Sequence, residues 1–218
     1  MRYFYHSIML SLLLSACGSD ENADRIVIGD SNTLFSLNEL QYQNPYVVQV
    51  TDTNGNAVAN TRVTIAVIAS AYRTGFYSDA SEVWVAQISN ECTAEDKNNN
   101  AILDAGEDVN ASGYLEPTNA ATVTAHPTLE PTLDGLSNSL LTDEFGFGYF
   151  SITYPKSEAN WSRFKITASA DVSGTEGNAI LAGILPSVVE DLADITQSPP
   201  GGVTSAYGLD SNCEIFIP

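Results

Sequence analysis

The sequence predicts an all-β protein that folds as an antiparallel β-sandwich. Three observations lead to this fold class. Short runs of alternating β-branched and polar residues recur along the chain, turn residues such as Asn-Gly separate them, and only one stretch has the pattern of a helical turn. Short strands joined by turns, almost without helices, are typical of two packed antiparallel sheets.

The expected strands follow one another along the whole chain. A short strand at 25–28 opens the domain. Two further strands at 46–52 and 61–68 flank the Asn-Gly turn signal of 53–60, which predicts two strands and a connection. The remaining strands are expected at 81–88, 120–126, 142–154, 163–171 and 179–185, with a helical turn at 187–195.

Composition and charge set limits on what the protein can be. At 218 residues, with 44% apolar residues, ten Tyr and eight Phe, the chain can bury a sizeable core. One β-domain with an insertion is as natural at this length as two small domains, and we expect one. The formal net charge of −19 argues against nucleic acid as a partner, because only eight Lys and Arg are present to contact phosphates.

The N-terminus has the features of a bacterial export signal. Arg2 precedes an apolar run at 8–14, which is too short to span a bilayer, so we expect residues 1–16 to be a signal peptide. The alternative is an ordinary signal followed by a chance cysteine, but Leu-Ser-Ala-Cys at 14–17 resembles the lipobox of bacterial lipoproteins. That resemblance implies lipidation of Cys17, with 17–24 as lipidated residue and tether, and Gly18 implies an outer-membrane address.

The segment 91–119 contains seven acids and one lysine and has no apolar periodicity, yet its oxygen-bearing residues recur at regular spacing. Counting from Asp96 as position 1, oxygen donors stand at positions 1, 3, 5, 7, 9 and 12, which is the spacing of a twelve-residue calcium loop. The expected ligands are Asp96, Asn98, Asn100, Ile102 through its carbonyl, Asp104 and Glu107. The sequence therefore predicts a calcium site, against the alternative of a solvated acidic loop.

The same spacing begins again twelve residues later. The expected second ligand set is Asp108, Asn110, Ser112, Tyr114 through its carbonyl and Glu116, with Gly113 at the sharp turn. Position 12 of this copy falls on Asn119, an amide where a carboxylate is expected. The first copy has Ala101 in place of the turn glycine, so Ala101 must take a backbone conformation that costs more for a residue with a Cβ. The sequence leaves open whether one or two calcium ions bind.

Two cysteines remain once Cys17 is lipidated. Cys92 stands at the start of the acidic segment and Cys213 near the C-terminus. Outside the cytoplasm such a pair is expected to form a disulfide, which would close a long loop and stabilise the fold by about 4–5 kcal/mol in the chain-entropy model. The alternative is two buried free thiols.

Two segments allow a family resemblance to be stated. Val48–Ile65, with Val-Thr-Asp-Thr-Asn-Gly-Asn-Ala-Val in its first part, and Thr142–Ile152 resemble the bacterial Ig-like domains of invasin- and intimin-type surface proteins. The resemblance spans about 46–185 and implies an extracytoplasmic β-sandwich that serves as spacer, stalk or adhesive unit, without catalysis. The expected domain is thus 25–218, which departs from the family by an insertion at 91–119, an extension at 186–218 and the presence of a single module.

Few residues suggest catalytic chemistry. His126 is the only histidine after the expected signal peptide, so a zinc site or a Ser-His or Cys-His pair lacks parts, and we expect no enzyme. Paired carboxylates of a glycosidase stay open, because their separation is a spatial property. Trp84, Tyr149, Phe150 and Tyr154 are expected to pack on strands, with carbohydrate stacking as the lesser alternative, and Trp161 is the better candidate for an exposed ring.

These expectations lead to two hypotheses about function. In the first, the protein is an outer-membrane lipoprotein whose calcium-stabilised Ig-like domain acts at the cell surface as an adhesion or ligand-binding module. Its partners would be the membrane, through the lipid anchor, and a protein or carbohydrate ligand. In the second, it is a structural or assembly accessory of the cell envelope, and the insertion only braces the fold. The direction in which the lipoprotein faces is open.

Overall fold

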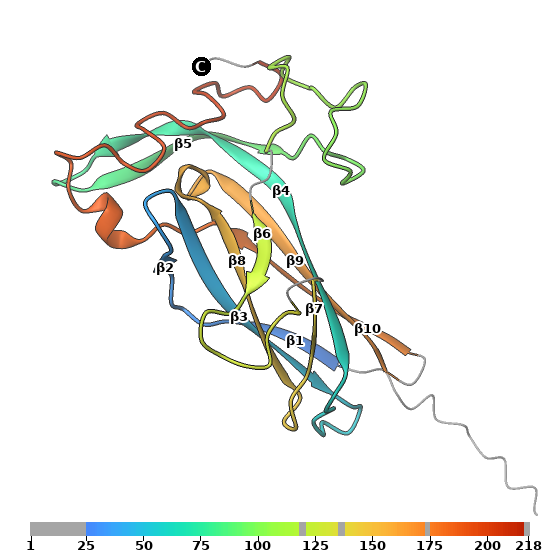
Figure 1. Cartoon of the computed structure of the whole chain (residues 1–218). Helices are drawn as coiled ribbons and strands as arrows, with labels where there is room; N and C mark the ends of the chain where they lie inside the picture. Colours follow the sequence, from blue (N-terminus) through green and yellow to red (C-terminus); the bar gives the residue numbers. More distant parts are fainter. Residues whose placement is uncertain (1–24, 118–120, 135–137, 173–174, 216–218) are drawn as a thin grey trace, which may run out of the picture.

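The protein folds as two antiparallel β-sheets packed face to face, which confirms the predicted all-β sandwich (Figure 1). The structure is a computed structural model that describes residues 25–117, 121–134, 138–172 and 175–215. The expected signal peptide, Cys17 and the tether lie outside the described residues. Helical structure in the described part is limited to two short 3-10 turns, η1 (Lys156–Glu158) and η2 (Val189–Leu192), and η2 lies within the helical turn predicted at 187–195.

Each sheet consists of four strands that pair one after another and a further short strand that pairs with one of them. The first sheet has the order β1-β3-β8-β6, with β2 paired to β3, and the second has the order β10-β9-β4-β5, with β7 paired to β4. The first consists of β1 (Arg25–Asp30), β2 (Phe35–Ser36), β3 (Gln41–Thr51), β6 (Thr122–Ala125) and β8 (Phe147–Pro155). The second consists of β4 (Arg62–Asp79), β5 (Trp84–Thr93), β7 (Ser139–Leu141), β9 (Ser162–Val172) and β10 (Thr175–Ile184).

The main core lies between the two sheets and is built from the alternate residues that the sequence pattern marks as apolar. Val48 and Val50 of β3 and Ile65 of β4 are fully buried there, as are Phe150 and Ile152 of β8. Tyr46 stacks on Phe150 with ring centroids 5.5 Å apart. Because β3 and β4 belong to different sheets, they do not form a hairpin with each other. The Asn-Gly segment between them turns back on the end of β3 through an isolated bridge between Thr51 and Ala57 and then joins the two layers.

Strand β4 continues well beyond the predicted end at residue 68. Its first half pairs with β9 inside the sandwich, and its second half pairs with β5 in a two-stranded ribbon that projects from the sandwich (Figure 1). The register shifts between Ala69 and Ala71 and again between Thr74 and Gly75. These irregularities interrupt the alternation of apolar and polar residues, which is why the sequence pattern ended the strand early.

The C-terminal extension lies along the second half of β4. Gly75 exchanges backbone hydrogen bonds with this segment, donating to Gly208 at 2.9 Å and accepting from Ser205 at 2.9 Å. A second hydrophobic cluster fills the space beneath the extension, formed by Tyr72, Tyr77, Cys92, Trp161 and Tyr207. The predicted disulfide is confirmed, because Cys92 and Cys213 are bonded across 121 residues of sequence and tie the extension to β5.

Trp161 corrects one expectation from the sequence. Its side chain is buried, and its ring packs edge-on against Tyr77 with centroids 5.0 Å apart. The residue follows a 3-10 turn, where the sequence suggests an exposed loop, but the C-terminal extension and the ribbon cover it. Phe150 and Tyr154 are buried on β8 as predicted, and Trp84 and Tyr149 are half-buried on their strands.

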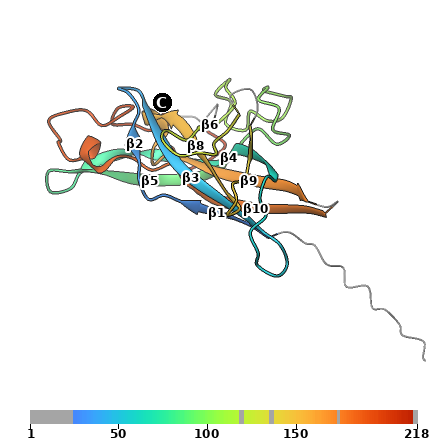
Figure 2. The same cartoon turned by 60° about the horizontal axis from the view of Figure 1, so that its bottom comes forward.

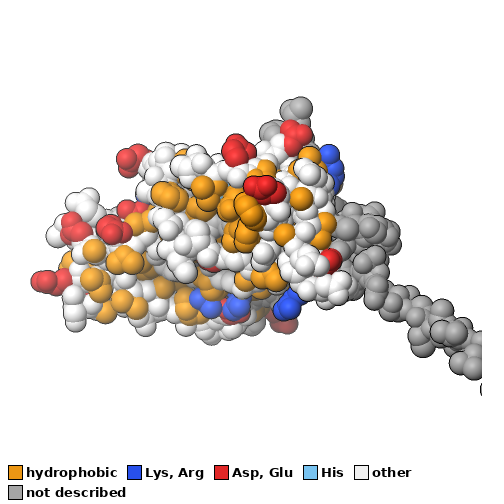
Figure 3. Space-filling model, turned by 90° about the horizontal axis from the view of Figure 1, so that it is seen from below, with side chains coloured by type: hydrophobic (Ala, Val, Ile, Leu, Met, Phe, Trp, Pro, Cys, Tyr) orange, Lys and Arg blue, Asp and Glu red, His pale blue; other side chains and the backbone are white. Residues whose placement is uncertain are grey.

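The molecule is elongated, as both cartoon views show (Figures 1 and 2). In Figure 1 the 94–117 segment lies at the end opposite the β3–β4 turn, and the last part of the C-terminal segment, which is bonded to β5 through Cys213, ends near it. Seen from below the view of Figure 1, acidic side chains are spread over the surface, and the few basic ones lie near the lower margin and at the upper right edge (Figure 3). Within the described residues there is no helix of the length and apolarity needed to cross a membrane.

Candidate metal-binding site

The acidic segment leaves the sandwich at the end of β5 and returns at β6. Two backbone hydrogen bonds fix its base. Ala94 donates to the carbonyl of Ser70 on β4 at 3.2 Å, and Glu95 donates to the carbonyl of Glu116 at 2.7 Å. The segment therefore begins and ends at one place on the sheet, and the two expected calcium loops are formed between these anchor points.

The first half of loop 1 (96–107) curls around the side chain of Asp96. Its carboxylate accepts the backbone N–H groups of Asn100 at 3.1 Å and Ala101 at 2.9 Å. The Asn98 side-chain oxygen accepts the same Asn100 N–H at 3.0 Å, and the Asn100 side-chain oxygen accepts the N–H of Ile102 at 2.7 Å. The side-chain oxygens at positions 1, 3 and 5 therefore all turn toward the inside of the loop.

The second half of loop 1 brings two carboxylates onto this curl. Asp104 accepts the side-chain amides of Asn98 at 2.8 Å and Asn100 at 2.9 Å, which joins positions 3, 5 and 9. Glu107 at position 12 accepts the backbone N–H groups of Lys97 at 3.0 Å and Asp104 at 3.0 Å. Glu107 thereby closes the loop, because its carboxylate accepts hydrogen bonds from both position 2 and position 9.

Loop 2 (108–119) repeats this arrangement as far as it is described. Asp108 accepts the N–H groups of Ser112 at 3.0 Å and Gly113 at 3.1 Å, as Asp96 does at the equivalent positions of loop 1. The Asn110 oxygen also accepts the Ser112 N–H at 3.0 Å, and the Asn110 amide donates to Glu116 at 2.5 Å. Ser112, Asn110 and Glu116 are therefore brought together, and Asn119 lies outside the described residues.

The residue that closes loop 2 is Glu95, which the sequence reasoning missed. Its carboxylate accepts the N–H of Val109 at 2.9 Å and the N–H of Glu116 at 3.1 Å. These are positions 2 and 9 of loop 2, the same positions that Glu107 holds in loop 1. Glu95 immediately precedes loop 1 just as Glu107 immediately precedes loop 2, so a signal was present in the sequence: a Glu-Asp pair at twelve-residue spacing.

The backbone conformations of the two loops repeat as well. Position 4 has a positive φ in both, at Asn99 with 57° and Ala111 with 58°. Position 6 also has a positive φ in both, at Ala101 with 59° and Gly113 with 81°. Ala101 therefore adopts the turn conformation that the sequence required of it. Non-glycine residues adopt this region at a cost, so the curl is held by the side-chain contacts described above.

Burial and charge distinguish this segment from an ordinary acidic loop. Glu95, Glu107 and Glu116 are 1%, 4% and 5% exposed, and none of them forms a salt bridge within the described residues. The only lysine of the segment, Lys97, donates instead to the carbonyl of Gly106 at 2.9 Å. Burial raises the pKa of Glu95, and burial together with the nearby charges of Glu95 and Asp108 raises the pKa of Glu116.

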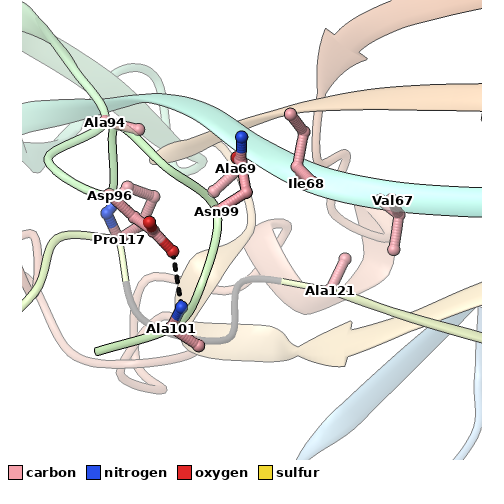
Figure 4. Close-up of a pocket in the computed structure, with 9 residues that line it drawn as sticks. All are labelled: Val67, Ile68, Ala69, Ala94, Asp96, Asn99, Ala101, Pro117 and Ala121. Atoms are coloured by element: carbon pink, nitrogen blue, oxygen red, sulfur yellow. Dashed lines mark hydrogen bonds between the residues drawn. The ribbon is translucent and has the colours of Figure 1, made fainter.

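The two loops differ in how they meet the sandwich. Loop 2 packs on β4, where the Asn110 amide lies 3.5 Å from the hydroxyl of the buried Tyr72. Loop 1 stands off from β4 across a hollow of about 160 Å³, with Asp96 turned toward Ala101 on one side and Val67 of β4 on the other (Figure 4). The side chains of Ile102 and Tyr114, expected to contribute only carbonyls, are exposed.

No group of three or more His, Cys, Asp or Glu side chains able to hold a metal ion occurs among the described residues. Each donor set contains three carboxylates, Asp96, Asp104 and Glu107 in loop 1 and Asp108, Glu116 and Glu95 in loop 2, and these carboxylates do not converge into such a group. His126 follows β6, and its Nδ1 accepts the N–H groups of Thr128 at 3.2 Å and Leu129 at 3.0 Å, as expected for a strand-end residue.

Comparison of the whole chain with models of protein families, with curated proteins and with solved structures found no match.

Proposed function

We propose that residues 95–116 bind calcium in two loops and that the ions act structurally. The observation that supports this most directly is the set of buried carboxylates without a positive partner. A buried charge is costly unless it is paired or coordinates a metal. Glu95, Glu107 and Glu116 are buried carboxylates with only hydrogen-bond donors around them, so a divalent cation supplies the charge that the segment lacks.

The residues present fit a hard cation. Calcium takes six to eight oxygen ligands from carboxylates, amides and carbonyls, and both loops offer these donors. In loop 1 the ligands would be the six residues named from the sequence. In loop 2 they would be Asp108, Asn110, Ser112, Tyr114 and Glu116, with Glu95 in the place expected for Asn119. Sites of this kind in extracellular modules commonly have Kd values of about 10⁻⁴ to 10⁻³ M.

The protein carrying these loops is proposed to be an outer-membrane lipoprotein with one Ig-like domain, which serves as a surface adhesion or ligand-binding module. Support comes from the lipobox-like residues at 14–17, the sandwich, the disulfide and the position of the insertion at the end of the molecule away from the β3–β4 turn. A segment fixed in this way can present a defined contact surface. The second candidate is an envelope accessory, and the contact of Asn110 with Tyr72 favours such a bracing role.

Limited proteolysis tests the calcium proposal. Calcium that orders residues 95–116 should protect peptide bonds of the exposed loop 1 from a protease, and a chelator should remove this protection. A Glu107→Gln variant serves as the control, because it should be cleaved with or without calcium. Equal cleavage of the native chain in calcium and in chelator contradicts the proposal.

Labelling of intact cells separates the two functional classes. A membrane-impermeant lysine reagent should label the native protein at the cell surface if it is an adhesion module, and lysed cells give the total. An accessory that faces the periplasm stays unlabelled until the outer membrane is opened. Neither labelling result tests calcium binding, because labelling reports which way the protein faces. Calcium binding is tested by the proteolysis experiment.

A further inference from the structure

A groove crosses the side of the molecule where the sandwich meets the C-terminal extension, away from the calcium loops. Its walls are the 38–41 turn before β3, the η1 turn and the segment 190–201, and its larger part has a volume of about 830 Å³. A close contact holds the walls together, because Gly201 packs directly against Ser157. The groove is thus made by the fold and does not depend on a single loop.

The rim of the groove carries acidic side chains that no basic side chain of the described residues neutralises. Glu39, Glu190 and Asp194 are exposed on its rim, and none of the three belongs to a salt bridge within the described residues. The Asp194 carboxylate accepts the hydroxyl and the N–H of Thr196, which hold its pKa below the usual range. The rim therefore offers three carboxyl groups that form no salt bridge in the described part of the chain.

The floor of the groove already holds one cation of the protein itself. The Lys156 ammonium donates to Asp191 at 2.8 Å and lies 4.8 Å from the centre of the Tyr42 ring. Asp191 also accepts the Tyr42 hydroxyl at 2.5 Å. Lys156 is therefore neutralised by its own partners and leaves the charge of the rim uncompensated.

Apolar groups alternate with these charges. Leu40 lines the groove and is 76% exposed, and Pro155 and Pro200 also belong to its lining. An exposed aliphatic side chain beside unpaired carboxylates suits a ligand with both apolar and basic groups. Three separate segments of the chain line the groove, and it is open to solvent, which suits a peptide segment better than a small molecule that needs an enclosed pocket.

We propose that this groove binds an extended, lysine- or arginine-bearing segment of a partner protein, whose basic groups pair with Glu39, Glu190 and Asp194 and whose aliphatic or proline side chains pack on Leu40. This names a partner class for the ligand-binding role proposed above. It uses no residue of the calcium loops, so either proposal stands if the other fails.

The probe is a fluorescein-labelled peptide of sequence Lys-Pro-Leu-Lys-Pro-Leu-Arg, titrated with the purified full chain at low salt and followed by fluorescence anisotropy. Two matched peptides test the chemistry, one with Glu at each basic position and one with Gly-Ser in place of each Pro-Leu. We expect the first to show no binding and the second to bind more weakly. Binding of the probe should be the same in calcium and in chelator.

Variants assign the binding to the groove. The double variant E39Q/E190Q should weaken binding about three- to tenfold, because exposed ion pairs are worth about 0.2–1 kcal/mol each. L40S should weaken it at every salt concentration, and the control E144Q, at the other end of β8, should leave it unchanged. The proposal is overturned by absence of binding up to 1 mM protein, by equal binding of the Glu peptide, or by equal effects of E39Q/E190Q and E144Q.

Discussion

The carboxylate of Glu95 accepts the backbone N–H of Val109 at 2.9 Å, fourteen residues farther along the chain. Glu107 makes the equivalent contact to Lys97 at 3.0 Å. Each glutamate closes the loop that it does not immediately precede, so the two loops form a reciprocal pair. The residue that closes loop 2 thus lies before loop 1, where a linear reading of the spacing does not look for it.

Single substitutions of the two closing glutamates should weaken one of the two proposed calcium sites each. Glu95→Gln should weaken one of two sites, and Glu107→Gln the other, by about ten- to a hundredfold, because an interaction with a charged group contributes about 1.5–3 kcal/mol. Isothermal titration with calcium measures both affinities. Glu144→Gln is the control, since this exposed acid lies in the turn before β8. Full two-site binding by the Glu95 variant would contradict its role.

Loss of the disulfide should destabilise the chain substantially. The bond between Cys92 and Cys213 closes a loop of 121 residues, for which removal typically costs about 2–5 kcal/mol. We expect the urea midpoint of the native protein to fall on reduction to that of a Cys92→Ser/Cys213→Ser variant. The variant is its own control, because reductant should not affect its midpoint. Equal midpoints of oxidised native protein and variant would show that the bond stabilises nothing.

Gly75 should not tolerate a side chain. Its φ is 143°, and an added Cβ would lie 2.0 Å from the carbonyl oxygen of Gln87 on β5. Gly75→Ala should therefore cost about 2–4 kcal/mol by separating β4 from β5 at the bulge. Gly55→Ala is the matched control, because Gly55 also has a positive φ, 85°, but open space around it, and should cost about 1 kcal/mol. Chemical unfolding of both variants checks this, and equal costs would contradict the described register.

The buried carboxyl of Glu158 should make stability depend on pH. Burial raises its pKa, while hydroxyl groups of Ser162 and Tyr207, which donate to it, act in the opposite direction. Above its ordinary pKa of 4.5 the folded chain holds this proton more tightly than the unfolded chain, so stability falls as pH rises until the raised pKa is passed.

Glu158→Gln should remove this component and flatten the decline by up to about 1.4 kcal/mol per pH unit. Urea unfolding between pH 4.5 and 8 in chelator measures the slopes. Glu95 and Glu116 have pKa shifts of the same direction and contribute equally to both proteins, so the difference isolates Glu158. A slope unchanged from that of the native protein would contradict the prediction.

The sandwich could be predicted because apolar and polar residues alternate regularly along its strands. Val48, Val50 and Ile65 are examples of the apolar residues, and all three are buried in the core. The ribbon could not, since two bulges interrupt the alternation in β4 and because its apolar face is covered by residues more than 120 positions away, such as Tyr207. The same reason explains Trp161, whose burial depends on that distant segment.

The curl of the first loop could be predicted because the side chains that form and close it, from Asp96 to Glu107, lie within twelve consecutive residues. The role of Glu95 could not, because it depends on how the chain returns to the base of the insertion through the Glu95–Glu116 hydrogen bond. The spacing of side chains identifies a loop, whereas the contact that closes the second loop is a property of the folded pair.

The most direct test of the account is the melting temperature of the purified chain during a calcium titration. Binding to the native state alone raises stability by mass action, and 10 mM calcium at a Kd of about 10⁻⁴ to 10⁻³ M should contribute about 1.4–2.7 kcal/mol per site. We predict a rise of about 3–10 °C for each site, reduced in the Glu95→Gln and Glu107→Gln variants and smallest in the double variant. A melting temperature that calcium leaves unchanged, or that rises equally in the double variant, would contradict the central claim that 95–116 folds around calcium.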